Sequence, residues 1–374
     1  MKLVELRWTP YALPFAAEFT TAHGGWGVRE GAILTILTDA GVRGIGEIAP
    51  LPSHGTAPNA ELLSALEEIA PRLIGLEIGD AAPVADRLLG PDPRHAPLRC
   101  AIDTAALAAE ARAAGVSVAR LLSPHAALYV TVNAVVDAAA CQDATAAALR
   151  AVSCGFRDIK LKVGLAGRAT DDVARVTAVR EAVGPGVRLR LDANGAWTEQ
   201  QAVETLLALE PYDIVLIEQP VAPGDADALR RVRDATRIPV AADEGVTGIE
   251  AARALIDARA VDALVIKLPV IGGPRHALQI VQMALRAGVG VIVTSALDSG
   301  VGVAAALHVA ATLPQPAHAC GLATLDLLED ALIVEELCIN EGRMAVPQVP
   351  GLGVTLDEDA LRRFATGPER VVRS

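Results

Sequence analysis

The chain has 374 residues, 52% of them hydrophobic, and a formal net charge of −12, which argues against nucleic acid or an anionic membrane surface as its partner. It begins without the apolar core of a signal peptide and contains no run of about 18 uncharged apolar residues, so no membrane segment is expected. Its five cysteines are scattered without a CxxC pair, and we therefore expect reduced thiols and a cytoplasmic protein.

Residues 1–124 are expected to form an α+β domain. The first 50 residues have the pattern of strands and turns, and AILTILTD followed by GVRGIGE indicates a strand, a turn and a second strand. Residues 59–122 are rich in alanine and leucine at helical spacing. The stretch AIDTAALAAEARAAG is the clearest helix, and Gly115 is predicted to end it.

Short apolar runs recur from residue 128 onward, and most are followed by an alanine-rich helical stretch. Strands that alternate with helices form βαβ units and a parallel sheet, and eight such units predict a closed barrel. The runs are LYVTVNAVV, DIKLKVG, VRLRLDANG, DIVLIEQPV, PVAADEG, ALVIKLPV, GVIVTSAL and HACGLAT.

The expected fold class is therefore α/β, a modified (β/α)8 TIM barrel over residues 125–330 with residues 1–124 as a capping domain. The eighth unit has the weakest pattern, because LDLLEDAL gives only a short helix signal. The tail, residues 331–374, is rich in turns, and we expect it to pack back on the capping domain and complete it.

Lysine is rare in this chain, and its positions are informative. There are 4 lysines against 29 arginines, and Lys160, Lys162 and Lys267 all lie in the apolar runs. Arginine stays charged at any useful pH, whereas a buried lysine can lose its proton and act as a base. One interpretation is a proton-transfer role. The other is that base composition favours arginine and that these lysines remained by chance.

Charged residues close the apolar runs, where a core strand would stay apolar. From Lys162, the next charged ends follow at intervals of 30, 26, 25 and 24 residues, at Asp192, Glu218, Asp243 and Lys267. Each interval is close to one βα unit, so these side chains should meet at the C-terminal mouth of the barrel, where active sites of this fold lie. Alternation along DIKLKVG points both of its lysines into the barrel.

Three carboxylates that converge in such a mouth repel one another unless a cation compensates them. An all-oxygen ligand set suits Mg²⁺ or Mn²⁺ better than Zn²⁺. Capping of the next helix or pairing with an arginine would explain one such acid. Three at matching strand ends favour a metal site formed by Asp192, Glu218 and Asp243.

Lysines on the second and sixth strands should face each other across this mouth. That arrangement suits a small carboxylate substrate bound to the metal, with an amine on either face of its α-carbon. The metal stabilises the enediolate that forms when the α-proton leaves. Lys160 is expected to help lower the pKa of Lys162. Arg190 shares the inward face with Asp192, and we expect a core ion pair for it rather than a role in tuning Lys162.

KLKVG, DANGAW, IEQP, AADE and the later lysine together resemble the muconate-lactonizing subgroup of the enolase superfamily. The resemblance covers essentially the whole chain, and the ordered set of motifs is specific. It implies Mg²⁺ ligands at Asp192, Glu218 and Asp243. It also implies a general acid/base at Lys162 and a second lysine, Lys267, on the opposite face of the substrate.

Two further residues follow from the same resemblance. Asn194 is similar to a family residue that contacts the metal ligands without binding the metal. Glu244 also matches a family position close to the ligands, and we expect a structural role for it. The family is often oligomeric, so a homo-oligomer is compatible with the resemblance.

The subgroup includes o-succinylbenzoate synthases, N-acylamino-acid racemases, dipeptide epimerases and cycloisomerases, which share the enediolate step. Epimerases usually carry a DxD pair near the eighth strand, but here Asp326 is followed two positions later by Leu328. GLATLDLL, TSALDSGVG and GEIAPLPSHG instead resemble o-succinylbenzoate synthases. This resemblance implies dehydration of 2-succinyl-6-hydroxy-2,4-cyclohexadiene-1-carboxylate in menaquinone biosynthesis. Lys162 would remove the α-proton and then protonate the departing hydroxyl, while Lys267 would stay charged and face the ring-derived anion.

Two alternatives stay open at this point. A racemase needs both lysines as acid and base, one on each face, and the sequence contains both, so an N-acylamino-acid racemase or a muconate-type cycloisomerase fits the same site. In another class, a catalytically inactive barrel would act only as a binding protein. Loss of a predicted metal ligand or of Lys162, the second lysine of KLK, would favour that class. The sequence keeps all of these residues.

Two loops of the capping domain are expected to help set the substrate specificity. The glycine-rich segment TTAHGGWGVRE around Trp26 is expected to cover the mouth as a lid, the alternative being an ordinary surface hairpin. A second loop carries Pro52, Ser53 and His54. For His23 and His54 a solvated or structural role is expected.

The loop after the seventh apolar run is the remaining candidate for contacts with the distal part of the substrate. Its hydroxyl and carboxylate side chains, or its backbone N–H groups, could meet the succinyl carboxylate. The candidates are Thr294, Ser295, Asp298 and Ser299.

Overall fold

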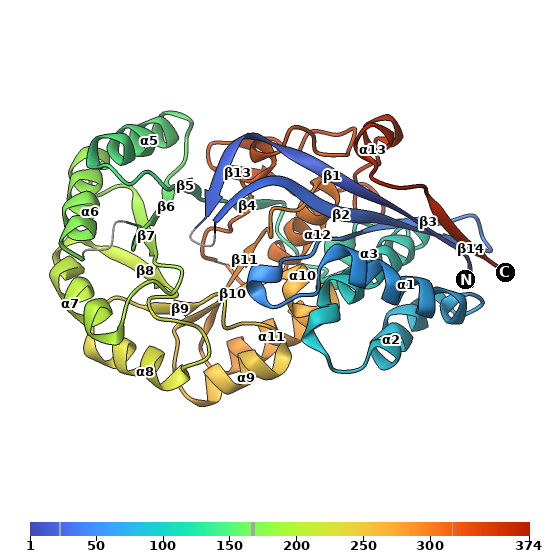
Figure 1. Ribbon diagram of the computed structural model, residues 1–374, viewed down its shortest axis with the longest axis horizontal. Helices are drawn as coiled ribbons and strands as arrows, with labels where there is room; N and C mark the ends of the chain where they lie inside the picture. The colour runs from blue at the N-terminus through green and yellow to red at the C-terminus, as the bar shows by residue number, and fades with distance from the viewer. Residues whose placement is uncertain (22–23, 166–168, 316) are drawn as a thin grey trace.

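The N-terminal residues form an antiparallel sheet in the computed structural model, which describes residues 1–21, 24–165, 169–315 and 317–374. Two long strands, β1 and β2, lie side by side and are followed by β3, so the predicted strand, turn and strand are confirmed (Figure 1). The strand order is β14-β1-β2-β3. The bounds are β1 (Leu3–Thr21), β2 (Gly24–Thr38), β3 (Arg43–Ile48) and β14 (Arg370–Arg373).

Helix α3 (Ala96–Ala113) packs on β3 and is buried over most of its length. Gly44 and Gly46 allow this close approach, because a Cβ atom at either position would collide with a backbone carbonyl of α3. The helix gives way to a turn at Gly115, whose φ of +70° favours glycine, as the sequence predicts. The other helical segments here are α1 (Asn59–Leu73), α2 (Ile78–Leu89), α4 (Val118–Leu122), η1 (Pro52–His54) and η2 (Pro93–His95).

A parallel sheet curls into a barrel wall with helices along its outer side, which confirms the predicted α/β fold (Figure 1). In the described part of the chain this sheet has seven strands, in the order β11-β10-β9-β8-β7-β6-β5. Consecutive strands are therefore neighbours, as βαβ repeats require. The strands are β5 (Ala134–Val136), β6 (Asp158–Lys162), β7 (Arg188–Asp192), β8 (Ile214–Glu218), β9 (Val240–Ala242), β10 (Ala263–Lys267) and β11 (Gly290–Thr294).

The helices that follow these strands carry the apolar faces that cover the barrel. Buried alanine, leucine, isoleucine and valine side chains of strands and helices form one large core cluster around it. The helical segments are α5 (Cys141–Ser153), α6 (Ala169–Val183), α7 (Glu199–Leu209), η3 (Glu210–Tyr212), α8 (Ala226–Ala235), α9 (Ile249–Asp257), α10 (Leu268–Ile271), α11 (Pro274–Arg286), α12 (Gly300–Ala310) and η4 (Leu325–Leu327).

The expectation of eight strands is wrong for the eighth run, HACGLAT. Its residues make isolated bridges only, from Cys320 to Val132 and from Gly321 to Thr294, so they close the barrel without forming a ladder. Gly321 lies directly against the side chain of Thr294, and glycine weakens a strand because it has no side chain to pack.

The first apolar run and the tail also differ from a simple barrel pattern. LYVTVNAVV divides into β4 (Tyr129–Thr131), which pairs with β13 (Arg343–Ala345), and β5, which joins the barrel. Strand β12 (Ile339–Asn340) pairs with β13, and α13 (Glu358–Phe364) packs against β1. Strand β14 then adds an edge strand to the N-terminal sheet.

In the described part of the chain, no helix combines the length and the apolar character needed to cross a bilayer. All five cysteines are free thiols, and two of them, Cys100 and Cys320, are buried.

The N-terminal sheet is fastened to the barrel through a buried carboxylate. Glu47 of β3 accepts hydrogen bonds from the hydroxyl of Tyr11, from the N–H and hydroxyl of Ser299 (2.9 and 2.7 Å) and from the N–H of Gly302 (2.8 Å). The last two residues begin helix α12, whose N-terminal N–H groups favour an anion. Burial, followed by the charge of Glu47, raises the pKa of the neighbouring Asp298 to about 6.

Replacement of Glu47 should therefore loosen the contact between sheet and barrel. Because Glu47→Ala leaves several buried donors without an acceptor, we expect the free energy of unfolding to fall by about 3 kcal/mol. Urea denaturation followed by circular dichroism measures it. The matched control is Glu61→Ala, which removes an exposed pair with Arg94 and should cost less than about 1 kcal/mol. Equal losses in the two variants would contradict the role given to Glu47.

Candidate active site

The charged residues at the strand ends meet at one edge of the barrel sheet. Lys162, Asp192 and Glu218 are the last residues of β6, β7 and β8, and the strand register places them side by side. Lys267 is the last residue of β10, and Asp243 follows β9 directly. The intervals in the sequence therefore correspond to one position repeated on neighbouring strands.

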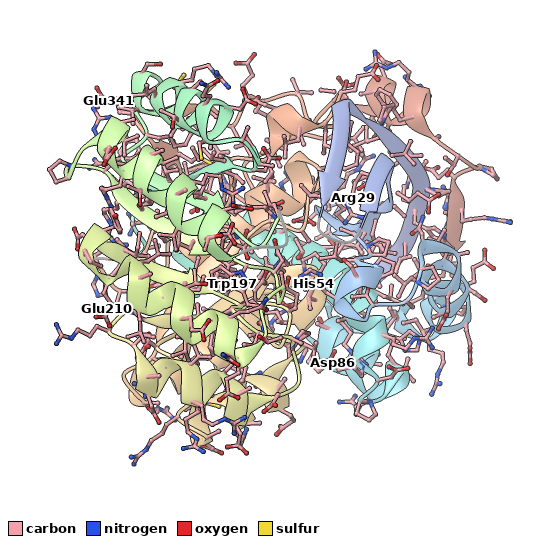
Figure 2. All side chains as sticks on the ribbon, turned by 60° about the vertical axis from the view of Figure 1, so that its left-hand side comes forward. Arg29, His54, Asp86, Trp197, Glu210 and Glu341 are labelled. Atoms are coloured by element: carbon pink, nitrogen blue, oxygen red, sulfur yellow. The ribbon has the colours of Figure 1, made fainter. Side chains whose placement is uncertain are left out.

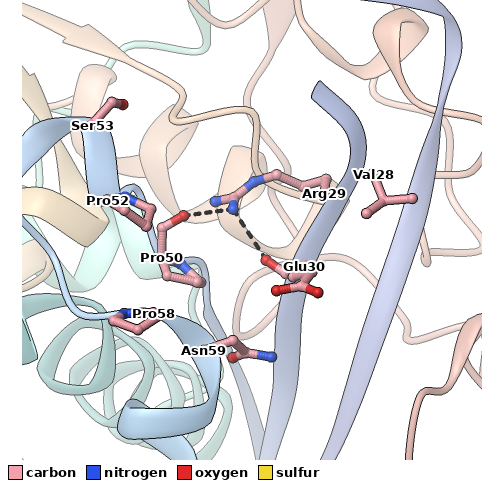
Figure 3. A pocket seen from close by; sticks show the side chains of 8 residues that line it. All are labelled: Val28, Arg29, Glu30, Pro50, Pro52, Ser53, Pro58 and Asn59. Carbon is pink, nitrogen blue, oxygen red and sulfur yellow. Dashed lines mark hydrogen bonds between the residues drawn. The ribbon is translucent and has the colours of Figure 1, made fainter. Parts of the chain in front are cut away.

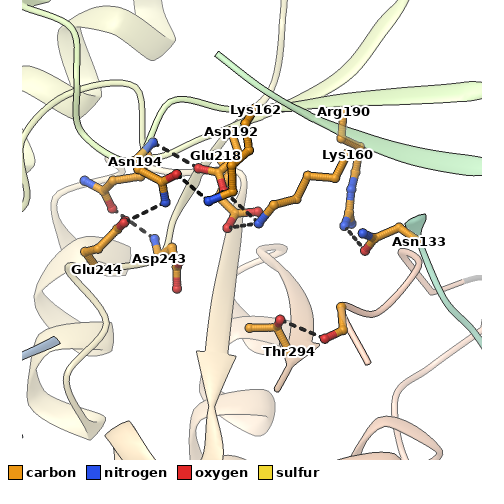
Figure 4. Close-up of polar contacts among 12 residues, drawn as sticks. Asn133, Lys160, Lys162, Arg190, Asp192, Asn194, Glu218, Asp243, Glu244 and Thr294 are labelled. Atoms are coloured by element: carbon orange, nitrogen blue, oxygen red, sulfur yellow. Dashed lines mark hydrogen bonds and ion pairs between the residues drawn. The ribbon is translucent and has the colours of Figure 1, made fainter. Parts of the chain in front are cut away.

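Ammonium groups pair with these carboxylates (Figure 4). The Nζ atom of Lys160 lies 2.8 Å from Oδ2 of Asp192 and 2.7 Å from Oε1 of Glu218. Lys267 pairs with Oδ1 of Asp243, and Nζ of Lys162 lies 3.9 Å from Oδ2 of Asp192. Since the three acids are at most 5% exposed, the lysines supply charge compensation that water would otherwise provide.

Burial and charge shift the pKa values of this cluster in opposite directions. Burial opposes ionisation of Asp192 and Asp243, but Lys160 and Lys267 respectively outweigh it and hold both pKa values below the usual range. Burial raises the pKa of Glu218 to about 7, despite the charge of Lys160. Burial alone would lower the pKa of Lys160, yet Asp192 and Glu218 together raise it above the ordinary lysine value.

Lys162 is held by an amide rather than by a close carboxylate. Its Nζ donates to Oδ1 of Asn194 at 2.8 Å, and the amide nitrogen of Asn194 donates to Oε1 of Glu244 at 3.0 Å. Asn194 has a φ of +44°, and its N–H donates to Asp192 at 3.0 Å. Strain of this kind is typical of functional sites. Glu244, for which a structural role is expected, thus acts on Lys162 through Asn194.

Sequence reasoning did not single out Gln219, although it lies in the IEQP motif. Gln219 is fully buried, has a φ of +39°, and its Oε1 accepts the N–H of Asp243 at 3.0 Å. It therefore fixes the backbone of a predicted metal ligand. The sequence did contain a signal for this residue, because Gln219 is a polar residue that directly follows the buried strand β8.

A cavity of about 320 Å³ opens at this end of the barrel, a volume within the usual range for a small-molecule site. Ser53, Thr294 and Ser295 line it, and their predicted contact with the substrate stays a prediction. Charged and amide side chains form part of the wall, namely Lys160, Lys162, Asp192, Asn194, Asp243, Glu244 and Lys267. Apolar side chains form another part, namely Leu51, Val135, Ala296, Leu297, Ala323 and Leu327.

Two of the predicted substrate-binding residues do not line this cavity. Asp298 and Ser299 are buried to within 1% and face Glu47 at the contact between sheet and barrel. The hydroxyl of Ser299 accepts the N–H of Val301 at the beginning of α12, and the carboxylate of Asp298 accepts the N–H of Ala296. The sequence pattern does not reveal these contacts. The backbone of Trp26 lies on β2 opposite Phe19, but the structure does not describe the Trp26 side chain. His23 lies outside the described residues.

Arg190 corrects the expectation of a core ion pair. Its guanidinium donates to the carbonyl oxygen of Ala319 at 2.8 Å and to Oδ1 of Asn133 at 2.5 Å, and the described residues offer it no carboxylate partner at ion-pair distance. The side chain is 2% exposed and extends from β7 next to Lys160 of the neighbouring strand (Figure 4).

His54 lies in the cavity, where a solvated or structural role was expected. It belongs to η1 of the N-terminal region and sits between that region and the barrel (Figure 2). Its Nε2 lies 3.9 Å from Oδ2 of Asp243, and its side chain is only 9% exposed. The capping region therefore contributes a nitrogen base to the edge of the carboxylate cluster.

Arg29 on β2 holds the loop that carries His54. Its guanidinium donates to the carbonyl oxygen of Pro50 at 2.6 Å and to that of Glu30 at 3.1 Å (Figure 3). It also donates to the carbonyl oxygen of Leu297 at 2.9 Å, and Leu297 lines the cavity with a φ of +63°. One buried arginine thus connects both loops that border the cavity.

The carboxylate cluster has the donor chemistry for a divalent cation. Asp192, Glu218 and Asp243 offer buried oxygen atoms at neighbouring strand ends, which suits a hard ion such as Mg²⁺. With Glu244, four buried acids face three lysines at this edge, and full ionisation of all seven side chains would leave one excess negative charge (4 − 3 = 1). A divalent ion turns this excess into one positive charge, which a substrate carboxylate would balance.

Comparison with known proteins agrees with this geometry. Residues 4–123 match the family "Mandelate racemase / muconate lactonizing enzyme, N-terminal domain", and residues 143–360 match "Enolase C-terminal domain-like". An o-succinylbenzoate synthase of Thermobifida fusca (strain YX) is 33% identical over 336 residues, covering 90% of this chain and 87% of the relative. A chloromuconate cycloisomerase, CbnB, of Cupriavidus necator is 31% identical over 363 residues, covering 95% of each chain.

A solved structure shows the same likeness. The N-succinyl Arg/Lys racemase from Bacillus cereus ATCC 14579 superposes with a TM-score of 0.91 at 27% sequence identity, over 100% of both chains. The relatives thus include lyases, isomerases and racemases on one fold, and enzymes of this superfamily use Mg²⁺. The chain belongs to the enolase superfamily, in the group of the mandelate racemase and muconate lactonizing enzymes.

Proposed function

We propose that the protein is a Mg²⁺-dependent o-succinylbenzoate synthase. In this proposal it dehydrates 2-succinyl-6-hydroxy-2,4-cyclohexadiene-1-carboxylate to o-succinylbenzoate in menaquinone biosynthesis. One observation carries the proposal: Lys162 of β6 and Lys267 of β10 line the same cavity, with buried carboxylates between their strands. Such a cavity suits the removal of a proton next to a carboxylate.

The residues of the chain take distinct parts in this reaction. Lys162, held by Asn194, accepts the α-proton, and the resulting ammonium then protonates the hydroxyl group that leaves as water. Lys267 keeps its charge beside Asp243 and faces the anion derived from the ring. Bound by Asp192, Glu218 and Asp243, Mg²⁺ would supply positive charge to the substrate carboxylate as the proton leaves.

The wall of the cavity favours this substrate over a dipeptide. Where dipeptide epimerases have an acidic pair, this chain has Asp326, which does not line the cavity, and Leu328. The nearby positions that do line it are Ala323, Thr324 and Leu327, which suit a hydrocarbon ring better than an ammonium group. The relative from Thermobifida fusca supports the same choice.

N-acylamino-acid racemase is the second candidate, because both lysines are present. Racemisation needs an acid and a base on opposite faces of the α-carbon, and Lys162 and Lys267 meet that need. The likeness to the N-succinyl Arg/Lys racemase along the whole chain favours it. Cycloisomerisation of a muconate is a further use of the same groups, supported by the relative from Cupriavidus necator.

A paired assay with Mg²⁺ separates these candidates. We expect the purified protein to form o-succinylbenzoate from its cyclohexadiene precursor, as ultraviolet absorbance reports, faster than it exchanges the α-proton of N-succinyl amino acids in D₂O. Fast exchange with slow dehydration would contradict the synthase and favour the racemase. Inactivity in both arms would direct the assay to muconates.

Replacement of the proposed base tests the mechanism. Lys162→Arg keeps the positive charge but cannot release a proton at working pH, so we expect dehydration to slow by at least about 100-fold. Circular dichroism and Mg²⁺ affinity should be unchanged. Lys2→Arg, at the lysine outside the cavity, is the matched control and should keep full activity. An active Lys162→Arg variant would show that another group is the base.

A further inference from the structure

An acid at the end of β5 lines the catalytic cavity without a partner. Asp137 follows β5 directly, its side chain is exposed, and it lines the same cavity as Lys162. Each of the other acids that line this cavity contacts a lysine or an amide of the site. These pairs are Asp192–Lys160, Asp243–Lys267 and Glu244–Asn194. In the described part of the chain, Asp137 alone among these acids has neither a hydrogen bond nor an ion pair.

The strand register places Asp137 next to the proposed base. Strands β5 and β6 are parallel neighbours, and the last pair of their ladder is Val136 and Leu161 (Figure 1). The next pair in the same register is Asp137 and Lys162. Residues in register on parallel strands lie about 4.8 Å apart and point to the same face of the sheet. Both side chains line the cavity, so this alternation continues beyond the end of β5.

Lys162 therefore has a polar neighbour on each side of its strand. On the β7 side, Asn194 accepts a hydrogen bond from Nζ of Lys162 at 2.8 Å, and its amide nitrogen donates to Glu244 (Figure 4). On the β5 side, the carboxylate of Asp137 remains available to the substrate. An ionised carboxylate can only accept hydrogen bonds, so Asp137 requires a donor on the substrate.

The proposed substrate has a single hydrogen-bond donor when its two carboxyl groups are ionised. Its ketone and its carboxylates only accept hydrogen bonds, whereas its 6-hydroxyl group donates one. This hydroxyl lies on the carbon next to the α-carbon, and Lys162 acts at both carbons in the proposed reaction. The hydroxyl must therefore lie close to Lys162, where Asp137 is a free acceptor.

We propose that Asp137 binds the leaving 6-hydroxyl group of the substrate and positions it for dehydration. This inference rests on the proposed function, because it assigns a contact with the substrate of that reaction. The α-C–H electron pair moves into the ring as the proton goes to Lys162, and the C–O electron pair leaves with the oxygen. The oxygen takes the proton from Lys162 and departs as water, so Asp137 neither gains nor loses a proton. The departing water has two O–H donors instead of one, so its hydrogen bond to the carboxylate strengthens as the C–O bond breaks.

Asp137→Ala removes this acceptor and should slow dehydration. We expect kcat/KM for the cyclohexadiene precursor to fall by about 10- to 100-fold, as for the loss of a hydrogen bond to a charged group. The product, o-succinylbenzoate, lacks the hydroxyl, so its inhibition constant should not increase. Because Asp137 is exposed and without a partner, the variant should fold, which circular dichroism checks. The matched control is Asp143→Ala, at an exposed acid of α5 that does not line the cavity, and it should keep full activity.

Deuterium exchange separates a contact with the leaving group from an indirect effect on Lys162. In D₂O, slow departure of the hydroxyl gives the enediolate time to regain hydrogen from Lys162. Substrate recovered from Asp137→Ala should therefore carry more deuterium at its α-carbon than substrate recovered from the wild-type protein. If Asp137 only supports Lys162, exchange and dehydration fall together, and the inference is overturned. An unchanged kcat/KM, or product binding that weakens as much as substrate binding, also overturns it.

The outcomes also separate this inference from the proposed function. If the wild-type protein dehydrates its substrate and Asp137→Ala does so equally well, only the inference fails. If the wild-type protein does not dehydrate this substrate, both fail.

Discussion

The pairing of buried carboxylates with lysines at the ends of β7, β8 and β9 is the constraint on which the rest of the site depends. Three acids with little exposure cannot ionise together without nearby positive charge. Lys160 meets this need for Asp192 and Glu218, and Lys267 meets it for Asp243. The same carboxylates are the proposed ligands of the ion, so lysine and metal share one set of negative charges. Binding of the ion would therefore release the ammonium groups toward the substrate.

The capping region completes this arrangement instead of only covering it. Glu47 fixes the N-terminal sheet to the beginning of α12, and Arg29 holds both the loop before His54 and the loop at Leu297. The walls of the cavity thus come from segments that are far apart in the sequence. A change in the contact between sheet and barrel should alter substrate binding as well as stability, and the lid around Trp26 stays a prediction.

The barrel and its charged strand ends were predictable because their signal is periodic and local. Asp192 is the last residue of its strand, and Glu218 takes the same position one βα unit later, so spacing alone brings them together. The sequence did not reveal contacts between segments that lie outside the regular repeat of βα units. Asp298 proved to face the N-terminal sheet, Arg190 found a carbonyl and an amide instead of a carboxylate, and His54 reached Asp243 from the capping region. The missing eighth strand shows the same limit, because isolated bridges leave no alternating pattern.

The central claim is that the lysines and the metal ion interact with the same carboxylates. The most direct test of this claim uses the small number of lysines in the chain. Four lysines give four resolvable side-chain signals in ¹³C,¹⁵N-lysine-labelled protein, and single Lys→Arg variants assign them. In the metal-free protein, NMR titration should place the pKa of Lys160 above the ordinary lysine value of about 10.4, and Mg²⁺ should lower it while Lys2 stays unchanged. A Lys160 that titrates like Lys2, or that does not respond to Mg²⁺, would contradict the account.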